Sequence, residues 1–254
     1  MKRPTEQAED IYSDYDRFAW FYNRHWGEEF SVPVLEIFRF ILFPHLERGS
    51  HILDLCCGTG QLAAGLIDRG YSVTGIDGSR EMLVLARINA PEAELIRADA
   101  RAFELPSIFA AVVSTFDSLN HILSIEELAV VFANVRRILK RDGVFVFDLN
   151  TEDEFETGNR ESMFDIVEDD HACVVRSRYD TSTRMKYYDV TMFTLEGEKW
   201  RRGDLTLRQR YYSAKEIVDC LTEAGFDRIS VHDANQEFKL SLSEGRAFFV
   251  AHNS

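Results

Sequence analysis

The sequence predicts an α/β fold with a mostly parallel central sheet, helices on both of its faces, and a small antiparallel β-sheet inserted late in the chain. Three observations support this. An apolar run at residues 52–57 leads through a glycine turn into apolar residues at helical spacing, namely Leu62, Ala63, Leu66 and Ile67. Strand-like and helix-like segments then alternate up to about residue 150. Residues 151–212 instead show the apolar–polar alternation of antiparallel strands.

The first half of the chain supplies most of the parallel sheet. Residues 10–30 are rich in aromatic side chains, and residues 32–47 predict a helix with one apolar face made of Val34, Leu35, Phe38, Ile41 and Leu42. Further strands are predicted at 72–76, 93–98, 108–115 and 144–149, with helices at 80–89 and 125–140 between them. The strand at 108–115 is apolar throughout, as a central parallel strand should be.

The second half contains the insertion and the end of the core. Antiparallel strands are predicted at 172–179, 185–195 and 205–212, separated by polar turns. Ser213 and Glu216 have the spacing of a capping box, which starts a helix that Gly225 ends. Two closing strands are predicted at 226–232 and 247–252.

Composition narrows the classes of function. The 254 residues have room for one large domain, or one domain with an insertion, and the formal net charge of −14 argues against a nucleic-acid partner. No apolar run is long enough to span a bilayer, and residues 1–10 are too polar and acidic for a signal or transit peptide, so we expect a cytoplasmic protein with no membrane partner. The spacing of the four cysteines suits neither a metal site nor a disulfide framework, and we expect reduced packing residues. A monomer and a homodimer both remain open.

The glycine turn at residues 58–60 predicts a nucleotide-like ligand. Residues 58–63 also fit the G-x-G-x-x-A pattern of dinucleotide sites, which keeps an NAD(P)-dependent oxidoreductase as an alternative. However, Asp54 lies shortly before the turn, where its charge would oppose a pyrophosphate. A ligand with a cationic part suits Asp54 better, and S-adenosylmethionine has a sulfonium and an ammonium but no phosphate.

Four motifs, at residues 52–60, 73–83, 97–101 and 116–120, resemble in this order those of class I S-adenosylmethionine-dependent methyltransferases of the small-molecule type. The resemblance covers roughly residues 15–150 and resumes near 213–251. It implies a Rossmann-like, seven-stranded sheet that binds S-adenosylmethionine and releases S-adenosylhomocysteine. A non-catalytic module that binds S-adenosylmethionine is a second alternative.

The expected cofactor residues follow the strand ends. Asp54, Cys57, Gly58 and Gly60 surround the turn. Asp77 lies about twenty residues further on, where a carboxylate that binds ribose is expected, although Asp77 or Ser79 could instead cap the next helix. Gly78 and Met82 would border the adenine. By the resemblance, Asp99 accepts a hydrogen bond from the adenine amino group and the Ala100 amide donates one to a ring nitrogen.

The aromatic leader has two interpretations. Residues 15–23 are similar to the Tyr-Asp-x-Phe-Ala-x-x-Tyr-Asp leader of small-molecule methyltransferases, with Asn23 in place of the final acid. On this basis Tyr15 and Tyr22 form part of a lid whose aromatic faces stabilise the sulfonium. The alternative is an amphipathic helix that only packs on the core.

The segment after the fourth strand, residues 116–121, is the expected acceptor side. Phe116 would border the cofactor, His121 or Asp117 could act as a base, and Asn120 could orient an acceptor. Alternatively, Asp117 and Ser118 only anchor the helix that follows. The segment lacks the Asn/Asp-Pro-Pro-Tyr/Phe stretch of enzymes that methylate nucleic-acid bases.

We expect three regions: residues 1–150 with the N-terminal helices and the cofactor-binding core, 151–212 as a β insertion that recognises substrate, and 213–254 completing the core. The insertion could equally be a dimerisation sheet or a stabilising flap. Its candidates for facing the acceptor are Arg178, Tyr187, Arg210 and Tyr212. The predicted function is methyl transfer by in-line displacement to a small molecule, on nitrogen or oxygen rather than carbon.

Overall fold

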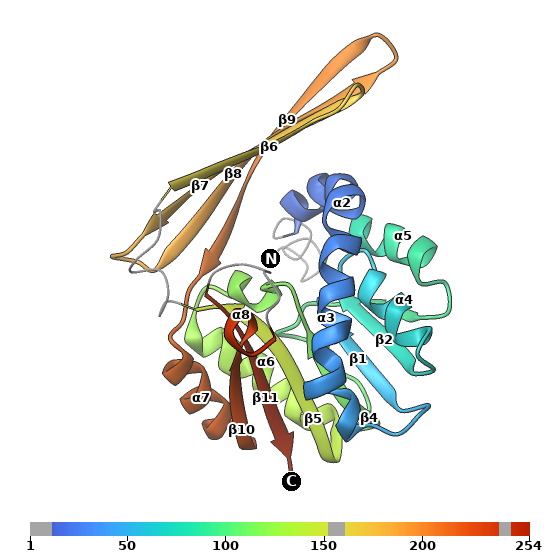
Figure 1. Cartoon of the computed structure of the whole chain (residues 1–254), viewed down its shortest axis with the longest axis vertical. Coiled ribbons are helices and arrows are strands. Elements are labelled where there is room, and N and C mark those ends of the chain that lie inside the picture. The colour runs from blue at the N-terminus through green and yellow to red at the C-terminus, as the bar shows by residue number, and fades with distance from the viewer. Residues whose placement is uncertain (1–11, 152–160, 239–244) are drawn as a thin grey trace, which may run out of the picture.

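The computed structural model describes residues 12–151, 161–238 and 245–254 (Figure 1). Its core is one seven-stranded sheet in the order β10-β11-β5-β4-β1-β2-β3. β1 pairs in parallel with β2 and β4, β2 with β3, and β4 with β5, whereas β11 runs antiparallel to β5 and β10. The predicted seven-stranded, mostly parallel sheet is confirmed. The strand bounds are β1 (His51–Leu55), β2 (Ser72–Asp77), β3 (Glu94–Arg97), β4 (Phe109–Ser114), β5 (Leu139–Asn150), β10 (Asp227–Asp233) and β11 (Arg246–Asn253).

Both faces of this sheet are covered, because its central strands are apolar at successive positions. Leu53, Phe145 and Phe147 belong to a buried cluster on the face of α6 (Ile125–Ile138) and α7 (Ala214–Glu223). Ile52 and Val146, one residue away along the strands, belong to a second cluster with α3 (Gly27–Ile41) and α4 (Gln61–Ile67). The remaining helices are α2 (Ser13–His25), α5 (Arg80–Asn89), α8 (Ala234–Phe238) and the 3₁₀ turns η1 (Phe43–His45) and η2 (Ser118–His121).

A second, four-stranded antiparallel sheet in the order β6-β7-β8-β9 projects beyond the carboxyl ends of the parallel strands (Figure 1). Its strands are β6 (Glu161–Val167), β7 (His171–Asp180), β8 (Met185–Glu196) and β9 (Lys199–Arg210). One face packs on α2, where Phe18 and Phe21 join a buried cluster with Cys173, Val175, Val190, Met192 and Leu205. The α2 helix therefore lies between the two sheets.

Several element boundaries differ from the sequence-based predictions. The helix expected at 32–47 begins at Gly27, after which Glu28 and Glu29 favour a helix start, and it ends at Ile41, just before Pro44. The antiparallel sheet has four strands rather than three. The strand predicted at 205–212 begins at Lys199, and its first half was not predicted because it is polar, exposed and shows no apolar–polar alternation. The capping box of Ser213 and Glu216 and the Ser79 cap of α5 are present. In the described part of the chain, no helix has the length and apolar character needed to cross a membrane.

Candidate active site

The turn after β1 needs glycine at two positions. Gly58 and Gly60 have φ angles of 52° and 84°, in the left-handed region where a side chain adds strain. A Cβ on Gly60 would lie 3.0 Å from the main chain of Ala86, so this glycine also lets α4 lie close to α5. A Cβ on Gly58 would lie 3.5 Å from the ring of Tyr22, which faces the turn from α2. The turn is therefore tight on one side and enclosed by an aromatic ring on the other.

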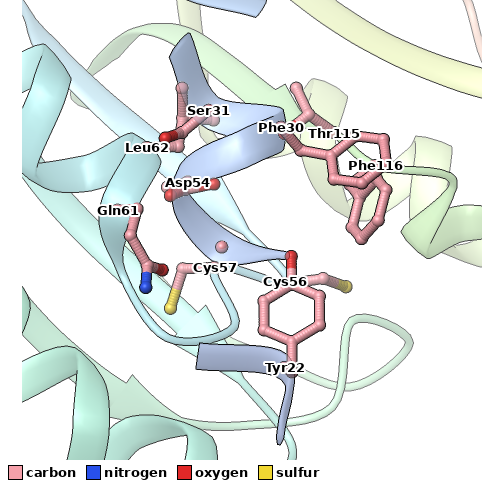
Figure 2. Close-up of a pocket in the computed structure, with 11 residues that line it drawn as sticks. Tyr22, Phe30, Ser31, Asp54, Cys56, Cys57, Gln61, Leu62, Thr115 and Phe116 are labelled. Atoms are coloured by element: carbon pink, nitrogen blue, oxygen red, sulfur yellow. The ribbon is translucent and has the colours of Figure 1, made fainter. Parts of the chain in front are cut away.

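A pocket lies between this turn, α3 and the end of β4 (Figure 2). Asp54 is at its inner end, 2% exposed, and its Oδ2 atom has no hydrogen-bond partner among the described residues. Burial and, less strongly, the charge of Asp77 raise the pKa of Asp54 to about 7. Figure 2 shows the Tyr22 hydroxyl pointing into the same pocket. The other lining residues are Gly27, Phe30, Ser31, Cys56, Cys57, Gln61, Leu62, Thr115 and Phe116.

Asp77 lies at the carboxyl end of β2 and supports the glycine turn. Its Oδ2 accepts a hydrogen bond of 2.9 Å from the Gly58 amide, and its Oδ1 accepts one of 2.8 Å from the Ser79 amide. Burial raises the pKa of Asp77 to about 6, although these amides oppose the shift. Ser79 itself accepts from the Met82 amide as the cap of α5. Both interpretations of this segment are therefore compatible: Ser79 caps the helix, and Asp77 remains at the edge of the site.

At the end of β3, Asp99 has two partners. Arg101 donates to both of its carboxylate oxygens, at 2.9 and 2.7 Å. The Tyr12 hydroxyl also hydrogen-bonds Asp99; burial opposes ionisation of the carboxyl group, but these donors lower the pKa of Asp99 overall. The Tyr12 ring lies directly over Gly78, because a Cβ there would come within 2.2 Å of a ring carbon. Tyr12 thus occupies the space between Gly78 and Asp99, the two residues expected to border adenine.

The α2 helix brings Tyr15 and Tyr22 to the site and is held there by polar contacts. The Ser79 hydroxyl donates to Asp16, and the side-chain amides of Gln61 and Asn89 both donate to Asn23 Oδ1. The Tyr22 ring packs against Phe116 with 5.6 Å between centroids. Burial raises the pKa of both tyrosines, so both phenols stay protonated. The residues that join α2 to α4 and α5 include Asn23, the position that departs from the leader pattern.

Beyond β4, Phe116 and Asp117 form a strained turn with φ angles of 63° and 47°. Asp148 on β5 stabilises it by accepting from both of their amides. Arg246, 4% exposed at the start of β11, donates to Asp148 and to Asp117, and its guanidinium lies over the ring of Phe116 at 5.5 Å. The buried cation is therefore paired with two carboxylates and an aromatic face.

His121 lies at the end of η2 with both ring nitrogens engaged. Its Nδ1 is 2.7 Å from the Arg208 carbonyl, which can only accept, so Nδ1 carries the proton. Its Nε2 therefore accepts, and the Tyr15 hydroxyl donates to it at 2.6 Å. Burial lowers the pKa of His121 below the usual value of 6.5. The ring is thus a neutral proton acceptor at neutral pH.

Comparison with known proteins identifies the family. A family model described as a methyltransferase domain matches residues 52–143. The putative methyltransferase YqeM of Bacillus subtilis (strain 168) is 30% identical over 82% of this chain and 85% of its own length. The chain belongs to the class I S-adenosylmethionine-dependent methyltransferases. A solved S-adenosylmethionine-dependent methyltransferase from Clostridium acetobutylicum ATCC 824 has the same fold, with a TM-score of 0.76 at 21% identity over 94% of this chain and 98% of that one.

A second relative, which matches a shorter part of the chain, has a substrate in its name. The dTDP-3-amino-3,6-dideoxy-alpha-D-glucopyranose N,N-dimethyltransferase of Streptomyces fradiae is 34% identical over 41% of each chain. Because the family is shown, the oxidoreductase suggested by the G-x-G-x-x-A pattern and the non-catalytic module are both set aside. S-adenosylmethionine is the methyl donor of this enzyme.

The residues present in the pocket fit S-adenosylmethionine. The buried Asp54 oxygen without a partner suits an ammonium group, since a buried carboxylate gains most from a cation. The glycine turn allows a ligand to approach the main chain closely. Tyr22 and Phe116 present aromatic rings at the other side of the pocket, which suits a sulfonium.

Three residues expected to face the acceptor of the methyltransferase instead join the insertion to the core. Asn120 is buried and exchanges hydrogen bonds with the backbone of Asn150 while donating to the Arg210 carbonyl. Arg210 donates to the Leu123 carbonyl, and the Tyr212 hydroxyl donates to the Ile122 carbonyl. These contacts give Asn120, Arg210 and Tyr212 a scaffolding role, and their contact with an acceptor stays a prediction.

Arg178 and Tyr187 lie on the face of the antiparallel sheet that points away from α2. They lie directly opposite each other in the β7–β8 register, with the guanidinium 3.8 Å from the centre of the tyrosine ring. Alternation along β7 places Cys173 and Val175 toward α2, so Arg178 is on the other, exposed face. Apolar–polar alternation located these strands, but only the packing of α2 shows which face is covered.

The sequence-based prediction missed several residues of the methyltransferase site. Asp148 and Arg246 are charged residues within apolar strands, and a buried charge in such a strand is a signal that a partner lies nearby. Gln209 and Tyr12 had no such signal, because polar residues in an antiparallel strand and at a helix start are ordinary. Their roles depend on which face of β9 packs on the core and on where the chain enters α2.

Proposed function

We propose that this methyltransferase transfers the methyl group of S-adenosylmethionine to a nitrogen or oxygen atom of a small molecule, most simply an amine. The observation that carries the proposal is His121: a buried, neutral imidazole whose Nε2 can accept a proton beside the lid tyrosines. Nitrogen and oxygen acceptors bring a proton that must leave, so a proton acceptor beside the donor pocket is useful to them.

The cofactor-side roles follow from the pocket. Asp54 would bind the ammonium group and Asp77 the ribose hydroxyls, while Gly58 and Gly60 allow close approach of the methionine part. Gly78, Met82, Asp99 and Ala100 would border the adenine. Cys57 lines the pocket beside the turn. When bound, S-adenosylmethionine supplies an activated methyl group on a sulfonium, which is already a good leaving group.

The chain's own contribution is then placement and proton removal. Tyr22 and Phe116 would exclude water from the sulfonium and hold the acceptor in line with the methyl–sulfur bond. The acceptor's proton would leave through Tyr15: its hydroxyl oxygen would take that proton while its own proton moves to the Nε2 lone pair of His121. Asp117, the other candidate base, has both carboxylate oxygens occupied, one by Arg246 and one by the side-chain amide of Gln209.

An amine is favoured over an alcohol on two grounds. The relative from Streptomyces fradiae is named as an amino-sugar N,N-dimethyltransferase. In addition, an alkylated ammonium loses a proton far more easily than an alcohol does, so a neutral imidazole that burial makes a weak base suits an amine better, because burial lowers the pKa of His121. The net charge of −14 supports a small-molecule acceptor rather than a nucleic acid.

The test is a screen of amines, phenols and carboxylates for release of S-adenosylhomocysteine, followed by His121→Asn on the best acceptor. We expect kcat to fall by about 10²-fold or more, with binding of S-adenosylhomocysteine unchanged. The wild-type rate should rise with pH through the lowered pKa of His121 and level off above it. Turnover only at carbon, or a variant with the wild-type rate at every pH, would overturn the proposal.

A further inference from the structure

The end of β9 is bound directly to the acceptor-side segment. The Arg208 carbonyl accepts from His121 Nδ1, and two residues later the Arg210 carbonyl accepts from the Asn120 amide at 2.8 Å. Figure 1 shows β9 as the strand that descends from the projecting sheet to the core. The antiparallel sheet is therefore attached to η2 on both sides of one residue, Gln209.

Gln209 is 3% exposed and lies on the face of β9 that packs toward α2. Its side-chain amide nitrogen donates to Asp117 Oδ2 and also to His121 Nε2, at 3.1 Å. Its amide oxygen accepts from the Tyr188 hydroxyl at 3.3 Å. The reverse orientation would place the amide oxygen against the Asp117 carboxylate, so the chemistry of the neighbours fixes the nitrogen toward Asp117 and His121.

We propose that Gln209 is a positioning residue that holds His121 in its neutral, Nδ1-protonated form, so that the inserted sheet completes the acceptor side of the site. The consequence for catalysis rests on the proposed function, whereas the effect on His121 itself does not. Gln209 acts through His121 and Asp117 and need not touch the acceptor.

The physical argument concerns the one lone pair of Nε2. The titratable groups that face the ring are Asp117, in the turn after β4, and Tyr15 on α2. Asp117 favours the imidazolium, because a carboxylate stabilises a nearby positive charge. The amide of Gln209 opposes this in two ways: it occupies an Asp117 oxygen, and it donates to the lone pair that a proton would take. Nε2 thus stays unprotonated, which the proposed transfer through the Tyr15 hydroxyl requires.

The test is a ¹⁵N NMR titration of the histidine side chains with S-adenosylhomocysteine bound, with the His121 signal assigned by its loss in His121→Asn. Gln209→Met keeps length and volume but cannot donate, and we expect the pKa of His121 to rise by about one unit. Gln209→Glu adds a second carboxylate and should raise this pKa further. Arg201→Ala, at the exposed far end of the same strand, is the matched control and should leave His121 unchanged.

A His121 that titrates as in the wild type in folded Gln209→Met and Gln209→Glu would overturn the proposal. If Gln209→Met does not fold, Gln209→Glu decides alone. The pH profile of kcat/KM with the best acceptor of the screen separates this inference from the proposed function. A shift of the His121 pKa together with a shift of the pH profile would support both the positioning role of Gln209 and the role of His121 as base. A shift of the pKa alone would support the positioning role and show that His121 is not the base.

Discussion

The two halves of the carboxyl edge of the sheet differ in whether their buried carboxylates have a cationic partner. On the side of β1 and β2, Asp54 and Asp77 have no cationic side-chain partner in the described chain, and burial raises their pKa values to about 7 and about 6. On the side of β4 and β5, Asp117 and Asp148 are paired with Arg246. One half keeps carboxylates available for a ligand, while the other neutralises them within the protein. The first half therefore leaves two carboxylates without a cationic side-chain partner among the described residues, whereas the second fixes the geometry of the turn after β4.

The largest effect should come from breaking the paired half. Arg246→Leu leaves two buried carboxylates beside the strained turn of Phe116 and Asp117, and removing one partner of a buried ion pair usually costs about 3–5 kcal/mol. We expect a loss of this size in the free energy of unfolding, measured by urea denaturation. Arg228→Ala, an exposed arginine near the C-terminus, should change it by less than about 0.5 kcal/mol. A similar small change in Arg246→Leu would show that the pairing contributes little.

On the ligand half, Asp77→Ala should weaken binding of S-adenosylhomocysteine by at least about 1 kcal/mol, because charge-assisted hydrogen bonds to the ribose are lost. Calorimetry measures this directly. The variant also removes the acceptor for the Gly58 and Ser79 amides, so the control is Asp233→Ala. Asp233 ends β10 and accepts from the Gln236 amide at the start of α8, a comparable local role away from the pocket. Equal affinity in folded Asp77→Ala would contradict the ribose assignment.

The same contrast explains what could be predicted from the sequence. The ligand half is local: Asp54 lies on β1, Gly58 and Gly60 lie in the turn that follows it, and Asp77 and Asp99 lie at the ends of the next two strands, so motif spacing predicts their positions. The order of strands and helices followed in the same way from alternation and helical spacing. These patterns predict each strand, helix and motif from the residues within it, without information about the elements that pack against it.

The paired half depends on contacts between distant residues. Arg246 is separated from Asp148 by 98 residues and from Asp117 by 129. Gln209 reaches Asp117 across 92 residues. Such pairs require the strand order and the register, which one sequence does not specify. The inserted sheet shows the same limit. Alternation along its strands does not tell which face α2 covers, and so it does not distinguish the exposed Arg178 from the buried Gln209.

The pH dependence of cofactor binding tests whether Asp54 is available for a cation. The ammonium group binds the ionised carboxylate, so affinity for S-adenosylhomocysteine should rise by about tenfold between roughly pH 5.5 and 7.5, as Asp54 loses its proton. The unliganded protein should show the opposite trend in stability. The pKa of Asp54 in the folded protein lies above its value of 3.8 in the unfolded chain. The stability contributed by protonated Asp54 is therefore lost as the pH rises toward 7.

Asp54→Asn provides the control for both trends, because an amide does not titrate. The variant should lose the part of each pH dependence that lies near pH 7 and retain any part near pH 6, where Asp77 titrates. A steep rise in affinity near pH 7 that persists in Asp54→Asn would assign it to another group.

The smallest effect concerns Tyr12, a side chain that occupies part of the ligand half. Its ring lies over Gly78 and its hydroxyl binds Asp99, so adenine can reach these residues only if the ring moves away. Tyr12→Ala should therefore bind S-adenosylhomocysteine more tightly by a factor of a few, since the competing contact is worth about 1 kcal/mol. Adenosine alone should show the same gain, and Tyr71→Ala, which removes a tyrosine packed on Phe43 away from the pocket, should show none. Weaker binding in Tyr12→Ala would mean that the ring contacts the bound nucleoside instead of competing with it, and that the ligand half also depends on the aromatic side chain at the N-cap of α2.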